Sequence, residues 1–177
     1  ALIVSQPPVS YVPTSKEYKS KMDLNSQQLI ILVIYCVAAG AMWAYLRHPR
    51  PLRSIPDIRF FVADIVSGAG GLALRVWSIR VLGKMFTTSV QIVTDHQLVT
   101  RGPYRRLRHP SYTGSIFALL SVPLVFGERW VAVVTFVALL LVYRYRVAVE
   151  EATLEEHFGE AYREYRRHSF MFIPYVW

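Results

Sequence analysis

The chain has 177 residues, of which 53% are hydrophobic, and it carries a formal net charge of +8. This length suits one domain or one small membrane bundle, and apolar bulk with basic loops is typical of a protein embedded in lipid. A nucleic-acid-binding protein would cluster its Lys and Arg on a soluble fold, so we expect no nucleic-acid partner.

The N-terminal half predicts a tail, two membrane helices and the loop between them. Residues 1–23 mix prolines, serines and lysines, which predicts an irregular tail. Residues 26–46 contain no charged side chain and are long enough to span a bilayer. Residues 47–59 hold three prolines and four arginines and predict a basic loop. A second membrane helix is predicted over residues 60–82.

Three charges and a glycine-rich stretch interrupt this second helix. Asp64 and Arg75 lie deep in it, whereas Arg80 is close enough to its end to reach the membrane surface. Charged side chains at such positions usually face the interior of a bundle. The SGAGG stretch at residues 67–71 lies inside the helix, whereas a nucleotide-binding loop must follow a strand. We therefore expect these small residues to allow close helix packing.

Two further apolar runs predict a helical hairpin. The first covers residues 114–126 and contains Pro123, which predicts a kink or an early end. Residues 127–129 form a tight connection, and a fourth helix is predicted over residues 130–151. The hairpin returns the chain to the side of the membrane from which it started. The tail, residues 83–113 and the C-terminus then share one side, which their larger number of Lys and Arg predicts to be cytosolic.

The C-terminal segment predicts a helix with one apolar face, followed by aromatic anchors. Its apolar spacing is that of an amphipathic helix with a break at Gly159. Phe170, Phe172, Tyr175 and Trp177 suit the membrane interface. The predicted fold class is therefore all-α: a polytopic membrane helical bundle with about four transmembrane helices plus a C-terminal amphipathic helix. We expect its parts to be a tail (1–23), two membrane helices with a basic loop (24–82) and a catalytic region (83–177).

A basic turn precedes the hairpin. Residues 101–114 read RGPYRRLRHPSYTG and place four arginines and His109 against the start of an apolar run. Guanidinium groups do not enter hydrocarbon cheaply, so the turn should lie at the membrane surface or in a polar cavity. We expect Arg105 and Arg106 to meet headgroup phosphates, where each contributes about 1 kcal/mol.

Residues suited to chemistry meet if the hairpin forms. Arg146 and Glu150 lie four apart on one helix face, which the hairpin brings beside His109 and Tyr112. Alone, the pair would be a surface ion pair worth at most about 1 kcal/mol, and the turn a headgroup site. Their adjacency favours a functional site. We expect no metal there, since Cys36 is the only cysteine and no two histidines lie three or four apart. The sequence also lacks the G-x-S-x-G motif of serine hydrolases.

These residues carry a family resemblance. The chain resembles the isoprenylcysteine carboxyl methyltransferases and their bacterial and archaeal relatives in HQLVTRGPYRRLRHPSYTG, in the later Arg-x3-Glu-Glu and in HFGEAYREY. The resemblance covers roughly residues 83–174. The wider group includes phospholipid N-methyltransferases and small-thiol methyltransferases. The resemblance implies that S-adenosyl-L-methionine binds between the turn and the last membrane helix, without a Rossmann domain.

The resemblance also implies roles for particular residues. It places Arg146 at the methyl acceptor, as the catalytic and substrate-binding residue. Gln91 lies near a glutamine of the family pattern, although its offset differs. The implied cofactor contacts are His96, Gln97, Leu98, Val99, Tyr104, His109, Pro110, Ser111, Tyr112 and Glu150.

The chemistry of this methyl donor fits those residues. Glu150 can accept hydrogen bonds from its amino group or ribose, and His109 or backbone amides can donate to its carboxylate. A carboxylate acceptor is already nucleophilic, so an arginine that orients it suffices. We therefore expect an amphiphilic or lipidated acceptor that reaches the site from the lipid bilayer, with an isoprenylcysteine-like carboxylate preferred.

Other functions stay open on the sequence alone. A phospholipid amine or a small thiol is the alternative acceptor, because those relatives share the turn. Sterol reductases carry a related C-terminal pattern with NADPH, and a non-catalytic membrane scaffold is also compatible. We expect an integral membrane protein whose site faces the cytosol, in the endoplasmic reticulum of a eukaryote or the cytoplasmic membrane of a prokaryote. The sequence does not indicate an oligomeric state.

Overall fold

The chain forms five α-helices and two short 3₁₀ turns over the residues that the structure describes. This computed structural model describes residues 15–47, 58–86 and 98–173, and the predicted all-α class is confirmed. The 3₁₀ turns are η2 (Gly83–Met85) and η3 (Gly102–Arg105). The α-helices are α1 (Ser15–Arg47), α2 (Ile58–Leu82), α3 (Pro110–Val125), α4 (Arg129–Phe158) and α5 (Glu160–Arg167).

Three segments of the described chain are long and apolar enough to cross a membrane: Gln28–Arg47, Ile58–Met85 and Arg129–Phe158. Helix α3 is also apolar but has 16 residues, because it ends two residues after Pro123, as predicted. Large apolar side chains are exposed along α1, α2 and α4, as expected of surfaces that face lipid. The membrane bundle is thus confirmed, whereas the number of spans stays a prediction.

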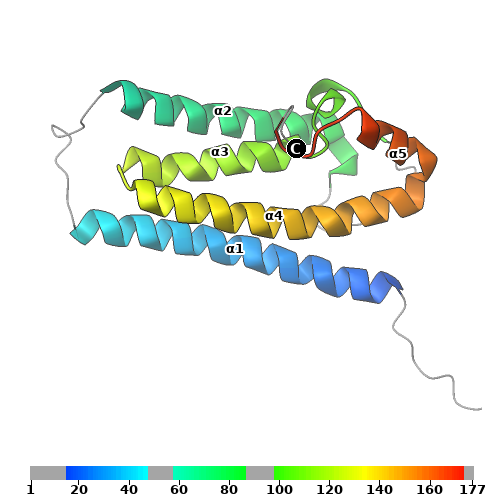
Figure 1. Cartoon of the computed structure of the whole chain (residues 1–177), viewed down its shortest axis with the longest axis horizontal. Coiled ribbons are helices and arrows are strands. Elements are labelled where there is room, and N and C mark those ends of the chain that lie inside the picture. Colours follow the sequence, from blue (N-terminus) through cyan, green and yellow to red (C-terminus); the bar gives the residue numbers. More distant parts are fainter. Residues whose placement is uncertain (1–14, 48–57, 87–97, 174–177) are drawn as a thin grey trace, which may run out of the picture.

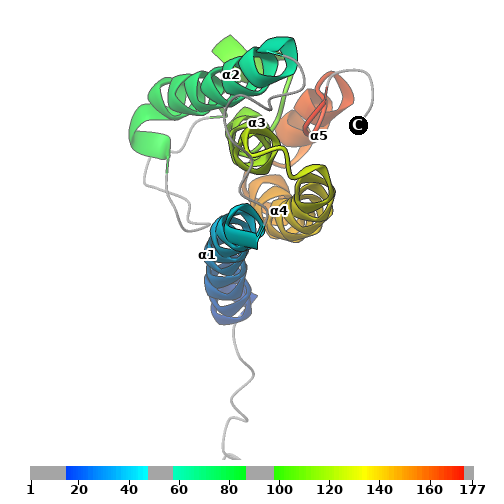
Figure 2. The ribbon, with the colours of Figure 1, turned by 90° about the vertical axis from the view of Figure 1, so that its left-hand side faces the viewer.

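Helix α3 lies between two neighbours. It packs against α2 on one side and α4 on the other, and α1 lies against α4 (Figure 2). Figure 1 places the end of α2, the start of α3, the end of α4 and α5 at the same end of the bundle. The hairpin between α3 and α4 turns at Gly127, whose φ of 76° favours glycine. The hairpin therefore returns the end of α4 to the turn that precedes α3.

All four predicted membrane helices are longer than expected, and α1 and α4 exceed their predicted ranges most. Helix α1 begins at Ser15, so the predicted tail is too long. Its first residues include neither Pro nor Gly, which favours a helix over an irregular tail. Helix α4 continues to Phe158 instead of ending at the predicted position, because its charged residues are good helix formers. Most of the predicted basic loop, residues 48–57, lies outside the described residues.

Glycines bring α2 and α3 into close contact. A Cβ atom on Gly71 would lie 2.6 Å from the carbonyl oxygen of Gly114 and 2.7 Å from the nitrogen of Ala118. Gly68 faces Ser121 with equally little room. Both α2 glycines belong to the stretch at residues 67–71, so its predicted role in helix packing is confirmed.

Gly71→Ala should lower the Tm of the detergent-solubilised protein, because a methyl group has no room between the two backbones. We expect a loss of about 1–3 kcal/mol in the free energy of unfolding, the usual cost of overpacking. Gly70→Ala is the matched control, since a Cβ atom there meets nothing within 4 Å. Alanine also favours a helix over glycine, so the control should keep or raise the Tm. Equal Tm values for the two variants would contradict this packing.

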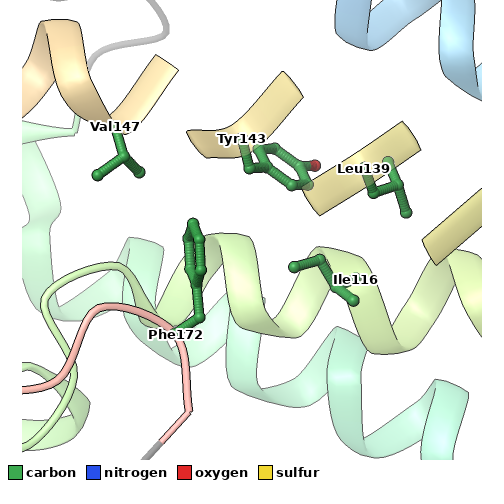
Figure 3. Packing of buried hydrophobic residues seen from close by; sticks show 5 residues of the cluster. All are labelled: Ile116, Leu139, Tyr143, Val147 and Phe172. Atoms are coloured by element: carbon green, nitrogen blue, oxygen red, sulfur yellow. The ribbon is translucent and has the colours of Figure 1, made fainter. Parts of the chain in front are cut away.

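The buried core lies between α3, α4 and the C-terminal segment. Figure 3 shows Phe172 pointing from that segment toward α4, in a cluster with Ile116, Leu139, Tyr143 and Val147. Phe172 is 2% exposed, so its predicted place at the membrane interface is wrong.

Backbone hydrogen bonds turn Phe172 inward. The N–H of Phe170 donates to the carbonyl of Arg106, and the N–H of Arg108 donates to the carbonyl of Phe170, both at 2.8 Å. The Thr113 hydroxyl then donates to the carbonyl of Phe172 at 2.8 Å. The C-terminal segment is therefore tied to the turn that precedes α3, which directs the ring of Phe172 into the core.

Helix α5 follows a change of direction at Gly159. The φ of this residue is 55°, a conformation that favours glycine, and the predicted break there is confirmed. The Tyr165 hydroxyl of α5 donates to the carbonyl of Tyr104 in η3 at 2.7 Å. Helix α5 therefore packs on the turn before α3 instead of continuing the line of α4 (Figure 1).

Candidate functional site

The turn before α3 fixes the position of His109. Pro110 occupies the first position of the helix, where its missing N–H removes no helical hydrogen bond. The N–H of His109 donates to the carbonyl of Met171 at 3.2 Å. The His109 ring makes no capping hydrogen bond, and the residue is 5% exposed. The ring is therefore buried and available to contact groups on α4.

The hydroxyl of Tyr112 lies between a cation and an anion of α4. It accepts a hydrogen bond from Nε of Arg146 at 2.8 Å and donates one to Oε2 of Glu150 at 2.9 Å. Nδ1 of His109 lies 3.6 Å from the same carboxylate oxygen. The predicted meeting of the Arg146 and Glu150 face with His109 and Tyr112 is confirmed.

Aromatic stacking holds Tyr112 in this position. Its ring lies 4.8 Å from the ring of Tyr143, with 19° between the two planes. It also stacks with the His109 ring at 5.6 Å and 9°. Because Tyr143 belongs to the buried core, the stack connects the packing of the bundle to the position of the Tyr112 hydroxyl.

A second carboxylate binds the other side of His109. Oε1 of Glu151 lies 2.7 Å from Nε of Arg108 and 3.2 Å from Nε2 of His109. The Arg108 guanidinium also donates to the carbonyls of Ser169 and Arg166. The arginines of this turn were expected either at the membrane surface or in a polar cavity. Arg108 therefore occupies the second of these environments. The sequence marked Glu151 only as the second glutamate of the Arg-x3-Glu-Glu motif and did not reveal its contact with Arg108.

Arg108, His109, Arg146, Glu150 and Glu151 form an ion cluster that is buried except at Glu150. The Glu151 and Arg108 side chains are each 8% exposed, and Arg146 is 5% exposed. Two guanidinium groups and two carboxylates compensate each other here, as burial of charge requires. The Glu150 side chain is 31% exposed, which makes it the carboxylate of this cluster that a ligand can reach.

Tyr104, a further predicted cofactor contact, lies in η3. It is buried, and burial raises the pKa of its phenol, with the negative charge of Glu150 adding to the effect. The phenol therefore stays protonated at neutral pH and keeps its hydrogen to donate.

The structure describes four of the other predicted contacts, namely Ser111, Pro110, Leu98 and Val99. Ser111 faces α2, where its hydroxyl accepts a hydrogen bond from Arg75 at 3.2 Å. Pro110 is buried in the first turn of α3. Leu98 and Val99 are half-buried in the segment before η3. The remaining candidates, His96, Gln97 and Gln91, lie outside the described residues.

Arg75 makes a contact that the sequence did not reveal. Its Nη1 donates to Ser115 at 2.6 Å and to Ser111 at 3.2 Å. The two serines lie four residues apart on one face of α3. The sequence showed Arg75 only as a cation inside a membrane helix. Its serine partners depend on how α2 and α3 align at the glycine contact.

A hollow of about 320 Å³ opens on a neighbouring face of α4. Glu151 contributes to its lining, together with Arg166 of α5 and Met171 of the C-terminal segment. Tyr112, Arg146 and Glu150 do not line it. The hollow is therefore lined by Glu151 of the ion cluster but not by Glu150, the more exposed carboxylate.

Comparison with protein families gives a match over most of these residues. The model of the isoprenylcysteine carboxyl methyltransferase (ICMT) family matches residues 65–156, which include Arg75, the turn before α3, Arg146 and Glu150. A probable protein-S-isoprenylcysteine O-methyltransferase of Oryza sativa subsp. indica is 24% identical over 165 residues. That alignment covers 90% of this chain and 85% of the rice protein.

Two further relatives are longer than this chain. Protein-S-isoprenylcysteine O-methyltransferase B of Arabidopsis thaliana is 31% identical over 108 residues, which cover 60% of this chain and 55% of that protein. The solved structure of a eukaryotic intramembrane Ras methyltransferase, ICMT, superimposes with a TM-score of 0.71 and 22% identity. The superposition covers 93% of this chain and 55% of that one, so the chain spans about half of these two relatives.

Proposed function

Because the chain belongs to the isoprenylcysteine carboxyl methyltransferase family of membrane methyltransferases, we propose that it methylates the carboxylate of an isoprenylcysteine-like acceptor, with S-adenosyl-L-methionine as donor. The observation that carries this proposal is the Tyr112 hydroxyl, held between Arg146 and Glu150. One side chain thereby joins a cation suited to an anionic acceptor and an anion suited to a cationic donor. Family membership also favours methyl transfer over the sterol-reductase alternative.

The Glu150 carboxylate fits the polar groups of this donor. The donor offers an ammonium group and ribose hydroxyls, which give hydrogen bonds that a carboxylate accepts. Among the described residues, both contacts of Glu150 use Oε2, so Oε1 can serve a ligand. His109 and Tyr112 orient the carboxylate, and Tyr104 of η3 is a further proposed contact. His96, Gln97, Leu98, Val99, Pro110 and Ser111 remain proposed contacts on the family resemblance.

Arg146 is the proposed acceptor-binding residue. The bound donor supplies an electrophilic methyl group on a sulfonium, and an ionised carboxylate attacks it without losing a proton. The guanidinium carries five N–H donors, of which Nε–H binds Tyr112, and its fork matches a carboxylate. Arg146 then aligns the acceptor, and its burial keeps water from the reacting groups. This buried cation favours an anionic acceptor over a phospholipid amine.

We place the site at the cytosolic surface of the membrane. Arg105 and Arg106 are exposed on the turn before α3, at the end of the bundle where α5 also lies. Basic residues at this end support a cytosolic orientation and contact with anionic headgroups. An amphiphilic acceptor would enter from the bilayer while the donor enters from water. The membrane would be the endoplasmic reticulum in a eukaryote and the cytoplasmic membrane in a prokaryote.

Thermal unfolding of the detergent-purified protein with candidate cofactors tests this function. S-adenosylmethionine and S-adenosylhomocysteine should each raise the Tm, since a ligand at 100 times its Kd stabilises by about 2.7 kcal/mol. NADPH at the same concentration should leave the Tm unchanged. Stabilisation by NADPH alone would replace the methyltransferase proposal with the reductase one.

A further inference from the structure

Tyr162 presents a buried hydroxyl without a hydrogen-bond partner among the residues that the structure describes. The residue lies on α5, is 1% exposed and is among the largest fully buried side chains. Its hydroxyl is also the single buried side-chain polar atom of the described chain that lacks a partner. Native proteins rarely leave such a group unpaired, because it has lost its bonds to water without replacement.

The neighbouring tyrosine of α5 has the opposite arrangement. The Tyr165 hydroxyl donates to the carbonyls of Tyr104 and Leu107, at 2.7 Å and 3.3 Å. The rings of Tyr162 and Tyr165 meet edge to face at 6.1 Å. The Tyr165 hydroxyl therefore ties α5 to η3, whereas the Tyr162 hydroxyl makes no hydrogen bond to the described residues.

Helix α5 reaches the ion cluster through the face that carries Tyr162. Tyr162 shares this face with Arg166, four residues later, whose Nε lies 3.8 Å from Oε2 of Glu151. Burial raises the pKa of the Tyr162 phenol, and the charges of Glu151 and Glu150 add to the effect. The hydroxyl therefore stays protonated, next to a cluster in which the carboxylates can only accept hydrogen bonds.

We propose that the Tyr162 hydroxyl belongs to the methyl-donor site and hydrogen-bonds to an acceptor atom of the bound donor. This inference rests on the proposed function and deepens it. Glu150 accepts hydrogen bonds from the ammonium or hydroxyl groups of the donor. The Tyr162 hydroxyl donates one to its carboxylate, to a ring nitrogen or to a ribose oxygen. The binding site then includes α5, which lies beyond residues 65–156 of the family match.

Tyr162→Phe separates this role from a structural one. Removing an unpaired buried hydroxyl should leave the Tm of the ligand-free protein unchanged or higher. Titration calorimetry should then show S-adenosylhomocysteine binding about three- to tenfold more weakly, the loss expected for one neutral hydrogen bond. Tyr165→Phe is the matched control from the same helix. It should lower the ligand-free Tm, because it removes the hydrogen bond from α5 to the carbonyl of Tyr104, and change the affinity less.

The outcomes distinguish this inference from the proposed function. If the original protein binds S-adenosylhomocysteine and Tyr162→Phe binds it equally well, the role of Tyr162 is overturned while the function stands. A Tyr162→Phe variant that fails to fold, or that loses Tm with unchanged affinity, also overturns it, because its hydroxyl then already has a partner. If the original protein does not bind this ligand, the proposed function fails, and the inference fails with it.

Discussion

Arg146→Ala should reduce the rate of methyl transfer by about 100- to 1,000-fold, the range found when a positioned charge at a reacting centre is removed. The affinity for S-adenosylhomocysteine should change only a few-fold. Arg146 is 5% exposed and binds the Tyr112 hydroxyl, which keeps its second bond to Glu150 when the guanidinium is lost. The donor side of the site therefore survives while the acceptor loses its partner.

Steady-state kinetics with an isoprenylcysteine acceptor, together with calorimetry, measure the two effects of Arg146→Ala separately. Arg146→Lys keeps the charge but not the fork of donors, so it should recover only part of the rate. Arg144→Ala is the control for loss of charge, because Arg144 is exposed on the same helix two residues away. An Arg146→Ala variant that lost cofactor binding and kept its turnover at saturating donor would place Arg146 at the donor instead.

Glu150→Ala should weaken S-adenosylhomocysteine binding by about 10- to 100-fold. A charge-assisted hydrogen bond is worth about 1.5–3 kcal/mol, which corresponds to that loss. Glu150 also accepts the hydrogen of Tyr112 and lies 3.6 Å from His109, so its removal takes one contact from each of these side chains. The effect on affinity should therefore exceed that of Tyr162→Phe.

Calorimetry on the folded variant measures the loss, and Glu156→Ala provides the control. Glu156 is an exposed acidic residue on the same helix, six positions later. Its replacement changes the net charge equally and should leave the affinity nearly unchanged. If Glu150→Ala and Glu156→Ala bound the ligand alike, Glu150 would not belong to the donor site.

Hydropathy and the positions of Pro and Gly predicted the bundle, because both signals depend only on residues close together in the sequence. Uncharged runs gave the helices, and Pro123 and Gly159 marked two of their limits. The hairpin prediction was sufficient to bring Arg146 and Glu150 beside His109 and Tyr112. The start of α1 was missed, since a polar segment without Pro or Gly forms a helix as readily as a tail.

The contacts that sequence reasoning missed join segments far apart in the chain. Arg108 resembled its exposed neighbours, but the Glu151 carboxylate draws it inward from 43 positions away. Phe172 had the composition of an interface anchor, whereas backbone pairing with the turn directs it into the core. Arg75 was marked as a deep cation, yet its serine partners depend on how two glycine-lined helices meet.

Transfer of a labelled methyl group from S-adenosylmethionine tests the central claim most directly. The purified protein would be offered N-acetyl-S-farnesylcysteine, its methyl ester, phosphatidylethanolamine and a small thiol in parallel. We predict label only in the acceptor with a free carboxylate, as a methyl ester that base releases as methanol. Base-stable label in the phospholipid or in the thiol, with none in the farnesylcysteine carboxylate, would contradict the account.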